Sequence, residues 1–184
     1  HYSLLPKYRG APPIQTAILQ GESHTGVPLF ELDERLDHGP IVAQHSIRLT
    51  GRETYTALHD ALAQAGADLV ASLLASMERW IPIPRKPQDE HEAGYTKKFA
   101  ASDGFVNPER DTVDTVDRII RALNPEPGAW TLSDNLRELR EQFGVGRRIK
   151  LLEAERVPEG LVITKLHAEG GMPRSSQIKI ISRI

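Results

Sequence analysis

The hydrophobic pattern predicts two strands followed by one long helix in the first half of the chain. Residues 26–32 (GVPLFEL) and 41–49 (IVAQHSIRL) have the composition of strands, and the second alternates apolar and polar positions. After residue 49, apolar residues recur at helical spacing over about seven turns. They are Leu58, Ala61, Leu62, Ala65, Leu69, Val70, Leu73, Leu74 and Met77. Thr50 and Glu53 have the spacing of a capping box at the start of this helix. Strands next to a long amphipathic helix predict an α/β architecture.

Shorter elements follow from turn and cap residues. We expect a helix over 13–20 ending at Gly21, a helix over 112–123 capped by Asp111, a helix over 133–143 ending at Gly144, and a hairpin of 149–155 with 161–167.

A proline-rich stretch divides these elements into two groups. Residues 81–87 (IPIPRKP) contain three prolines, and a polar run over 88–92 follows. Such a sequence favours an extended, semi-rigid spacer. We therefore predict a domain over 1–80, a linker over 81–94 and a second domain over 95–184.

Composition removes several classes of site. The 184 residues carry a net charge of −2 and no cysteine, which excludes disulfides and thiol chemistry. None of the seven histidines has the i, i+4 spacing of a helical metal site, so we expect no metal. The longest uncharged apolar run, 69–77, is far too short to span a membrane, and a signal-peptide pattern is not found, which favours a cytoplasmic location. Residues 137–184 hold ten Lys and Arg against six Asp and Glu, a mild basic bias that by itself is typical of a solvated surface.

Two motifs resemble the signatures of folate-dependent formyltransferases. Residues 1–14 (HYSLLPKYRGAPPI) are similar to the family's H-x-S-L-L-P-x-Y-R-G-A-x-P-I signature. Residues 25–27 (TGV) and 36–41 (LDHGPI) are similar to its second signature. Each could be ordinary alone, the histidine as a chain end and the LDHGP segment as a turn, so their joint occurrence carries the resemblance. The R-G-A and P-I details, and residues 120–130 (IRALNPEPGAW), are most similar to the methionyl-tRNA formyltransferase branch.

The resemblance implies an α/β fold made of two parts. The first is the C-terminal half of the family's nucleotide-fold-like catalytic domain. The second is a small, shortened oligonucleotide-binding-like β-barrel. The first half of the catalytic domain is missing from these residues, so we expect an unpaired strand edge, an uncovered apolar face and self-association.

The resemblance also implies a reaction, transfer of a formyl group from 10-formyltetrahydrofolate to the amino group of initiator methionyl-tRNA, without a metal and by a monomer when full length. It assigns His1 to the oxyanion of the tetrahedral intermediate. Asp37 would orient that ring, favour its imidazolium form and help to move the proton. The implied folate-binding residues are Ser3, Leu4, Leu5, Pro6, Leu32, Asp33, Glu34 and Leu36. For Asp33 and Glu34, plain solvated charges are an equal alternative.

One departure from the family pattern affects the activity that we expect of this chain. The family has an Asn two residues before the motif His, a position that lies outside this sequence. We therefore expect the 184 residues alone to be inactive. Two alternatives stay open: a sugar-nucleotide N-formyltransferase, and a non-catalytic remnant that binds folate or RNA.

Overall fold

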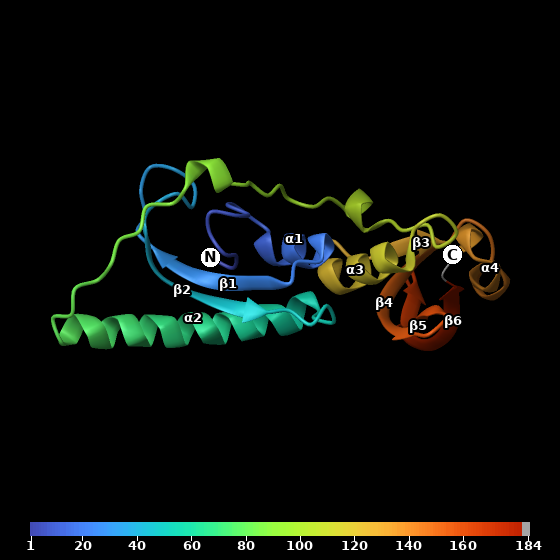
Figure 1. Ribbon diagram of the computed structural model, residues 1–184. Helices are drawn as coiled ribbons and strands as arrows, with labels where there is room; N and C mark the ends of the chain where they lie inside the picture. Colours follow the sequence, from blue (N-terminus) through green and yellow to red (C-terminus); the bar gives the residue numbers. More distant parts are fainter. Residues whose placement is uncertain (182–184) are drawn as a thin grey trace. The chain divides into compact units, whose positions relative to one another are not determined.

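The computed structural model describes residues 1–181 and divides into two compact units, His1–Lys98 and Phe99–Ile184 (Figure 1). The elements of the first unit are α1 (Pro13–Gln20), β1 (His24–Phe30), β2 (Ile41–Arg48) and α2 (Tyr55–Glu78). Strands β1 and β2 form an antiparallel hairpin, and α2 packs against both. The second predicted strand and the predicted helix over 13–20 are thus confirmed, with Gly21 in the left-handed conformation at the helix end (φ 65°), whereas the first strand begins and ends two residues earlier than predicted.

The two strands fit closely under the N-terminal segment because residue 26 is glycine. A Cβ at Gly26 would lie 2.3 Å from the carbonyl oxygen of His45 and 2.5 Å from Cδ2 of Leu4. No larger residue fits this position without moving the backbone, so the first motif and the second motif are packed directly on each other at this point.

The long helix begins later than predicted. Its N-cap is Thr54, whose hydroxyl accepts a hydrogen bond from the Ala57 amide, so the predicted capping role of Thr50 is wrong. The Glu53 carboxylate does accept from the Thr50 amide (2.6 Å) and hydroxyl (2.7 Å). These hydrogen bonds close the turn before the helix. The Ala57 amide, in the first turn of the helix, donates to Thr54 instead.

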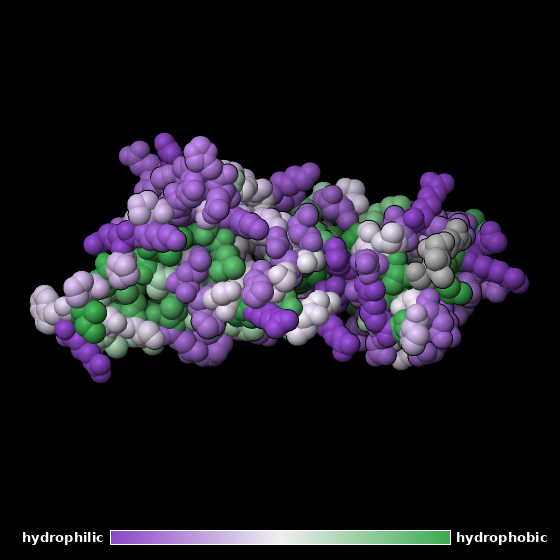
Figure 2. Space-filling model, viewed as in Figure 1, coloured by the Kyte–Doolittle hydropathy of each residue, from purple (hydrophilic) through white to green (hydrophobic). Residues whose placement is uncertain are grey.

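Most of the apolar stripe of α2 is not covered. Only Leu58 and Leu62 are buried, whereas Val70, Leu74 and Met77 are exposed. Figure 2 shows hydrophobic residues at the surface of the first unit along this helix. A shallow groove of about 540 Å³ lies between the helix and β1. This arrangement agrees with the predicted uncovered apolar face.

The segment predicted as a linker packs on the first unit instead. The backbones of Ile41 and Lys86 exchange two hydrogen bonds of 2.8 and 2.9 Å, which adds Lys86 to the edge of β2. Further along, Arg9 donates to the Gly94 carbonyl (2.7 Å) and accepts from the Thr96 amide (2.9 Å). These backbone pairs make the segment part of the first unit, and the boundary between the units lies between residues 98 and 99.

The second unit is a four-stranded antiparallel sheet with helices α3 and α4. Its elements are α3 (Val113–Leu123), β3 (Trp130–Leu132), α4 (Arg137–Phe143), β4 (Arg148–Val157), β5 (Gly160–Ala168) and β6 (Arg174–Ile181). The strand order is β3-β4-β5-β6, so the described strands form an open sheet where the resemblance implied a shortened barrel. Apolar residues of α3 and the sheet share one core, which includes Val116, Ile120, Ile149 and Leu166. The predicted hairpin is confirmed as β4 and β5.

Two predicted helix boundaries in this unit are wrong. Helix α3 is capped by Thr112, whose hydroxyl accepts from the Thr115 amide, while the Asp111 carboxylate accepts from the Asn107 amide. The predicted helix over 133–143 is a 3₁₀ turn (Ser133–Asn135) followed by α4, because Leu136 between them is extended. Gly144 ends α4 with φ 81°, as predicted.

The downstream motif has a structural role. The Asn124 side-chain amide donates to the carbonyls of Ile120 (2.9 Å) and Leu151 (2.8 Å), and so joins the end of α3 to β4. A Cβ at Gly104 would lie 1.8 Å from the Gly128 carbonyl oxygen, so the motif's glycine turn packs directly on the backbone of residue 104.

Candidate active site

The fold brings the two predicted catalytic residues together. Nδ1 of His1 lies 3.3 Å from Oδ2 of Asp37, and the two side chains are only 8% and 18% exposed. Nε2 of His1 donates to the Tyr8 carbonyl oxygen at 2.9 Å. The Tyr8 carbonyl can only accept, so Nε2 carries the proton of that hydrogen bond, and the Asp37 carboxylate lies beside the other ring nitrogen.

Asp37 is held in an unusual backbone conformation at the end of a closed loop. Its φ of 51° lies in the left-handed region, where Asp is one of the better tolerated residues. The Gly10 amide donates to Oδ2 of Asp37 at 2.7 Å. At the base of the loop, the Glu31 amide donates to the Pro40 carbonyl (3.0 Å), and a Cβ at Gly39 would lie 1.8 Å from the Glu31 oxygen. The closed base and the glycines fix where the carboxylate points.

The predicted folate-binding residues of the first motif differ in exposure. Ser3 and Leu5 are buried, and the Ser3 hydroxyl donates to the Lys7 carbonyl at 2.6 Å, so both support the turn from inside. Leu4 and Pro6 are half-buried. They border a hollow of about 370 Å³.

The predicted folate-binding residues of the loop are exposed. Leu32 is 89% and Leu36 60% exposed, which is unusual for leucine and leaves apolar surface beside Asp37. Asp33 is tied within the loop: its carboxylate accepts from the Arg35 amide (2.9 Å) and contacts Nδ1 of His38 (2.6 Å). The hydrogen bond from His38 lowers the pKa of Asp33. Glu34 is exposed.

Arg9, which the sequence did not single out, is the most deeply buried charge of this region. Its side chain is completely buried and donates to Glu90 (2.7 Å), Gln88 (2.9 Å) and Tyr95 (3.2 Å). The hydrogen bond from Arg9 lowers the pKa of Glu90. Oε1 of Glu90 also lies 3.3 Å from Nε2 of His38. Arg9 was quoted within the first motif, but its partners lie in the predicted linker, where no pattern indicates them.

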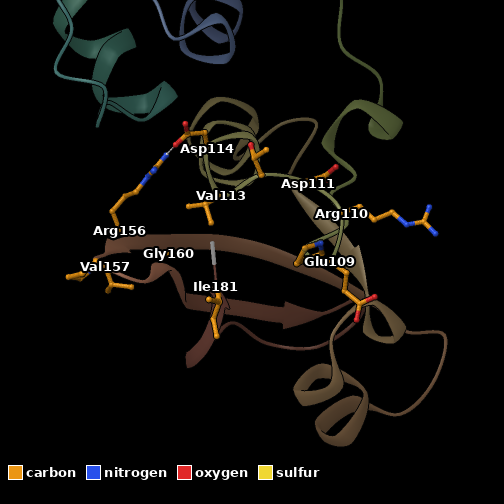
Figure 3. Close-up of a pocket in the computed structure, with 12 residues that line it drawn as sticks. Glu109, Arg110, Asp111, Val113, Asp114, Arg156, Val157, Gly160 and Ile181 are labelled. Atoms are coloured by element: carbon orange, nitrogen blue, oxygen red, sulfur yellow. Dashed lines mark hydrogen bonds and ion pairs between the residues drawn. The ribbon is translucent and has the colours of Figure 1, made fainter. Parts of the chain in front are cut away.

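The second unit has a separate hollow of about 350 Å³, bordered by the start of α3, the end of β4, the start of β5 and the end of β6 (Figure 3). Glu109, Arg110 and Asp111 border it as well. Arg156 reaches across from β4 to pair with Asp114 of α3, and it also contacts Asp117 at 3.2 Å. The hydrogen bond from Arg156 lowers the pKa of Asp114. Because three carboxylates (Glu109, Asp111 and Asp114) line the hollow with two arginines (Arg110 and Arg156), it is not a basic surface suited to a phosphate backbone.

Residues 1–181 contain neither a metal-binding cluster nor a membrane-spanning helix. In this range no group of three or more His, Cys, Asp or Glu side chains has the arrangement of a metal site. No helix formed by these residues is both long and apolar enough to cross a bilayer.

Known sequences provide relatives of nearly the whole chain. The profile of the formyl transferase family matches residues 1–74. The chain is 40% identical over 158 residues to methionyl-tRNA formyltransferase of Paramagnetospirillum magneticum, covering 86% of this chain and 48% of that protein. It is 37% identical over 160 residues to methionyl-tRNA formyltransferase of Thiobacillus denitrificans, covering 87% of this chain and 47% of that protein. The chain thus spans about half the length of these relatives.

Solved structures show the same fold at lower identity. HypX from Aquifex aeolicus in complex with tetrahydrofolic acid superposes with a TM-score of 0.69 and 21% identity, covering 90% of this chain and 31% of that one. WlaRD, a sugar 3N-formyl transferase, superposes with a TM-score of 0.65 and 18% identity, covering 99% of this chain and 61% of that one. The profile match shows that residues 1–74 belong to the formyl transferase family, and over most of its length the chain is similar to methionyl-tRNA formyltransferases.

Proposed function

We propose that this chain provides the His–Asp pair of an enzyme that transfers a formyl group from 10-formyltetrahydrofolate to the amino group of initiator methionyl-tRNA, in the cytoplasm. The observation that carries the proposal is the contact between His1 and Asp37, 3.3 Å apart within two family motifs. The sequence relatives support the acceptor, since both are methionyl-tRNA formyltransferases.

The geometry suits the chemistry of formyl transfer. The attacking amine adds to the formyl carbon, the carbonyl oxygen becomes an oxyanion, and the nitrogen must lose a proton. His1 would donate to that oxyanion from Nε2, because aimed donors stabilise such intermediates more than the ground state. Asp37 would hold the ring from Nδ1 and assist the transfer of the proton to the leaving nitrogen of the folate. The C–N bond to the folate then breaks, and tetrahydrofolate leaves with that proton.

One hydrogen bond must change during this cycle. Nε2 of His1 donates to the Tyr8 carbonyl oxygen in this structure. We expect the ring to exchange this acceptor for the oxyanion when the formyl group is bound. A ring held by Asp37 at Nδ1 keeps its position during the exchange.

The apolar and polar surface near the pair fits a folate. The exposed side chains of Leu32 and Leu36 on the loop that carries Asp37 would cover a flat, heteroaromatic pterin ring. Leu4 and Pro6, which are half-buried, border a hollow whose lining does not include this loop, and we assign them to the folate on the family resemblance alone. Ser3 and Leu5 support its backbone, and Asp33 holds the loop through His38.

The test uses a hybrid protein, because the relatives are about twice as long as this chain. The part of the Paramagnetospirillum protein that this chain does not match is joined to the 184 residues, and transfer of labelled formyl groups to methionyl-tRNA is measured. We expect activity in the hybrid and, in a His1→Ala version, a loss of about a hundredfold or more. An unaffected His1→Ala hybrid would overturn the assignment of the pair.

An amino-sugar nucleotide is the second acceptor to be tested, because the fold match to a sugar 3N-formyl transferase covers 99% of this chain. The same hybrid is offered an amino-sugar nucleotide in place of methionyl-tRNA. Preference for the sugar would favour the sugar-nucleotide enzyme. Folate binding without transfer to either acceptor would favour a non-catalytic, ligand-binding role.

A further inference from the structure

We propose that Gln88 is a positioning residue for Asp37: its side-chain amide fixes the loop that presents the carboxylate to His1. This inference rests on the proposed function, because a fixed position of the Asp37 carboxylate matters only if Asp37 takes part in the reaction. Gln88 lies in the segment that follows α2, far from both motifs in sequence, and packs on the first unit.

All the hydrogen-bonding groups of the Gln88 side chain are used within the protein. Oε1 accepts from Nε of Arg9 (3.1 Å) and from Nη2 of Arg9 (2.9 Å). Nε2 donates to the carbonyl oxygens of Asp37 (2.9 Å) and Gly39 (2.8 Å). A guanidinium only donates and a carbonyl only accepts, so this site requires a group with an acceptor on one side and two donors on the other. Among the side chains of this length, only glutamine supplies both.

Arg9 is a firm support for this amide. Its side chain is completely buried and is also held by Glu90 and Tyr95. Its backbone pairs on both sides with the segment that carries Gln88, through the Gly94 carbonyl and the Thr96 amide. The guanidinium therefore has little freedom to follow a moving loop.

The hydrogen bonds around Asp37 form a closed ring that starts at Arg9 and returns to the next residue, Gly10. Gln88 connects Arg9 to the Asp37 carbonyl, and the Asp37 carboxylate accepts from the amide of Gly10, the residue after Arg9. Asp37 is thus held at its backbone by Gln88 and at its side chain by Gly10. Its left-handed backbone (φ 51°) gives it both contacts at once. Without the amide of Gln88, the Asp37 backbone would lose its direct support, and only the closed base of the loop and the Gly10 contact would keep the carboxylate near His1.

Hydrogen exchange followed by mass spectrometry tests this role in the 184-residue chain at low micromolar concentration. Gln88→Glu keeps the acceptor for Arg9 and the side-chain length but replaces both donors by a carboxylate facing two carbonyls. Gln142→Glu, an exposed residue of α4, is the matched control with the same change in charge. We expect Gln88→Glu to speed exchange in peptides covering 31–40 and 7–12 by about tenfold, while peptides of α1 are unchanged. The control should change none of them.

Two comparisons separate positioning from a general loss of stability. In an Asp37→Ala background, Gln88→Glu should add no further change in the peptide covering 7–12, because the acceptor of the Gly10 amide is already gone. Equal acceleration of the loop and of α1, or no acceleration of the loop, would overturn the proposal. If Gln88→Glu does not fold, Gln88→Met removes both donors without adding a charge but also removes the acceptor of Arg9, so exchange in the peptide covering 31–40 relative to α1 then decides.

The hybrid enzyme provides the catalytic readout. There Gln88→Glu should lower kcat by about tenfold or more with a smaller change in KM for the formyl donor, since misplacing a reacting group mainly affects the chemical step. An unchanged kcat in an active hybrid would contradict the positioning role. An inactive hybrid in which the loop still responds to Gln88→Glu would contradict the proposed function and leave Gln88 as the support of Asp37.

Discussion

Asp37 has a left-handed backbone conformation, and its carboxylate accepts a hydrogen bond from the Gly10 amide. Two substitutions at this residue separate the contributions of these features. Asn also tolerates the left-handed conformation and keeps an acceptor for the Gly10 amide, whereas Ala keeps neither. We expect Asp37→Ala to lower the free energy of unfolding by about 1–2 kcal/mol and Asp37→Asn by clearly less. Urea denaturation of the two variants checks this order, and equal losses would argue against the role of the Gly10 contact.

Asp33 predicts a dependence of stability on pH. Its pKa is lowered in the folded chain by the hydrogen bond from His38, so the pair contributes stability above the ordinary carboxyl pKa and loses it as the pH falls through the lowered pKa. The difference in Tm between the parent chain and Asp33→Asn should therefore be present near pH 5 and shrink as the pH falls below about 4. Melting curves followed by circular dichroism provide the test. A difference that stays constant over this range would show that the ion pair does not act as the structure indicates.

Residues of the two motifs can be recognised in the sequence, whereas a residue that positions them, such as Gln88, cannot. His1 and Asp37 were predicted to cooperate through a family resemblance, and the structure places them in contact. Gln88 is 79 residues from Arg9 in the chain and belongs to no motif. Its role depends on which donors and acceptors the fold brings next to it, and hydrophobic periodicity contains no information on that.

At the scale of elements, helix caps provide a sharp comparison. Thr50 and Thr54 both precede α2, and the T-x-x-E spacing favoured Thr50, but only Thr54 caps the helix. Thr54→Ala should therefore lower the free energy of unfolding by about 1 kcal/mol, and Thr50→Ala by less. Thermal or urea unfolding of the two variants decides between them. A larger effect at Thr50 would show that the turn before the helix matters more than the cap.

The elements that the sequence predicted share a strong local signal, and those that it missed depend on distant partners. Helices α1, α2 and α3 have apolar stripes, and the β4–β5 hairpin has alternating strands around a turn. Strand β3 has three residues and β6 is mostly polar, so each is recognised only by its pairing with β4 or β5. The proline-rich segment was expected to be a spacer because its pairing with Ile41 and Arg9 is equally non-local.

At the scale of the molecule, the open face of α2 is the main departure from an ordinary domain. Val70, Leu74 and Met77 are exposed next to a groove that β1 borders. Exposed apolar surface of this kind favours association, and the relatives that share this segment are about twice as long. We expect the 184-residue chain to bind a hydrophobic dye such as ANS and to sediment in a concentration-dependent way. A Val70→Glu and Leu74→Glu double variant should reduce both effects, and dye binding that the double variant leaves intact would place the exposed apolar surface elsewhere.

The proposed action of Asp37 with His1 in formyl transfer is tested most directly by a single-turnover measurement. The hybrid and its Asp37→Asn variant are each saturated with formyl donor and mixed with methionyl-tRNA, and the first formylation event is timed. Because Asn can keep the Gly10 contact but cannot hold a proton or balance an imidazolium, we predict a rate about a hundredfold lower with the fold retained. A variant that formylates methionyl-tRNA at the rate of the parent hybrid would contradict the account.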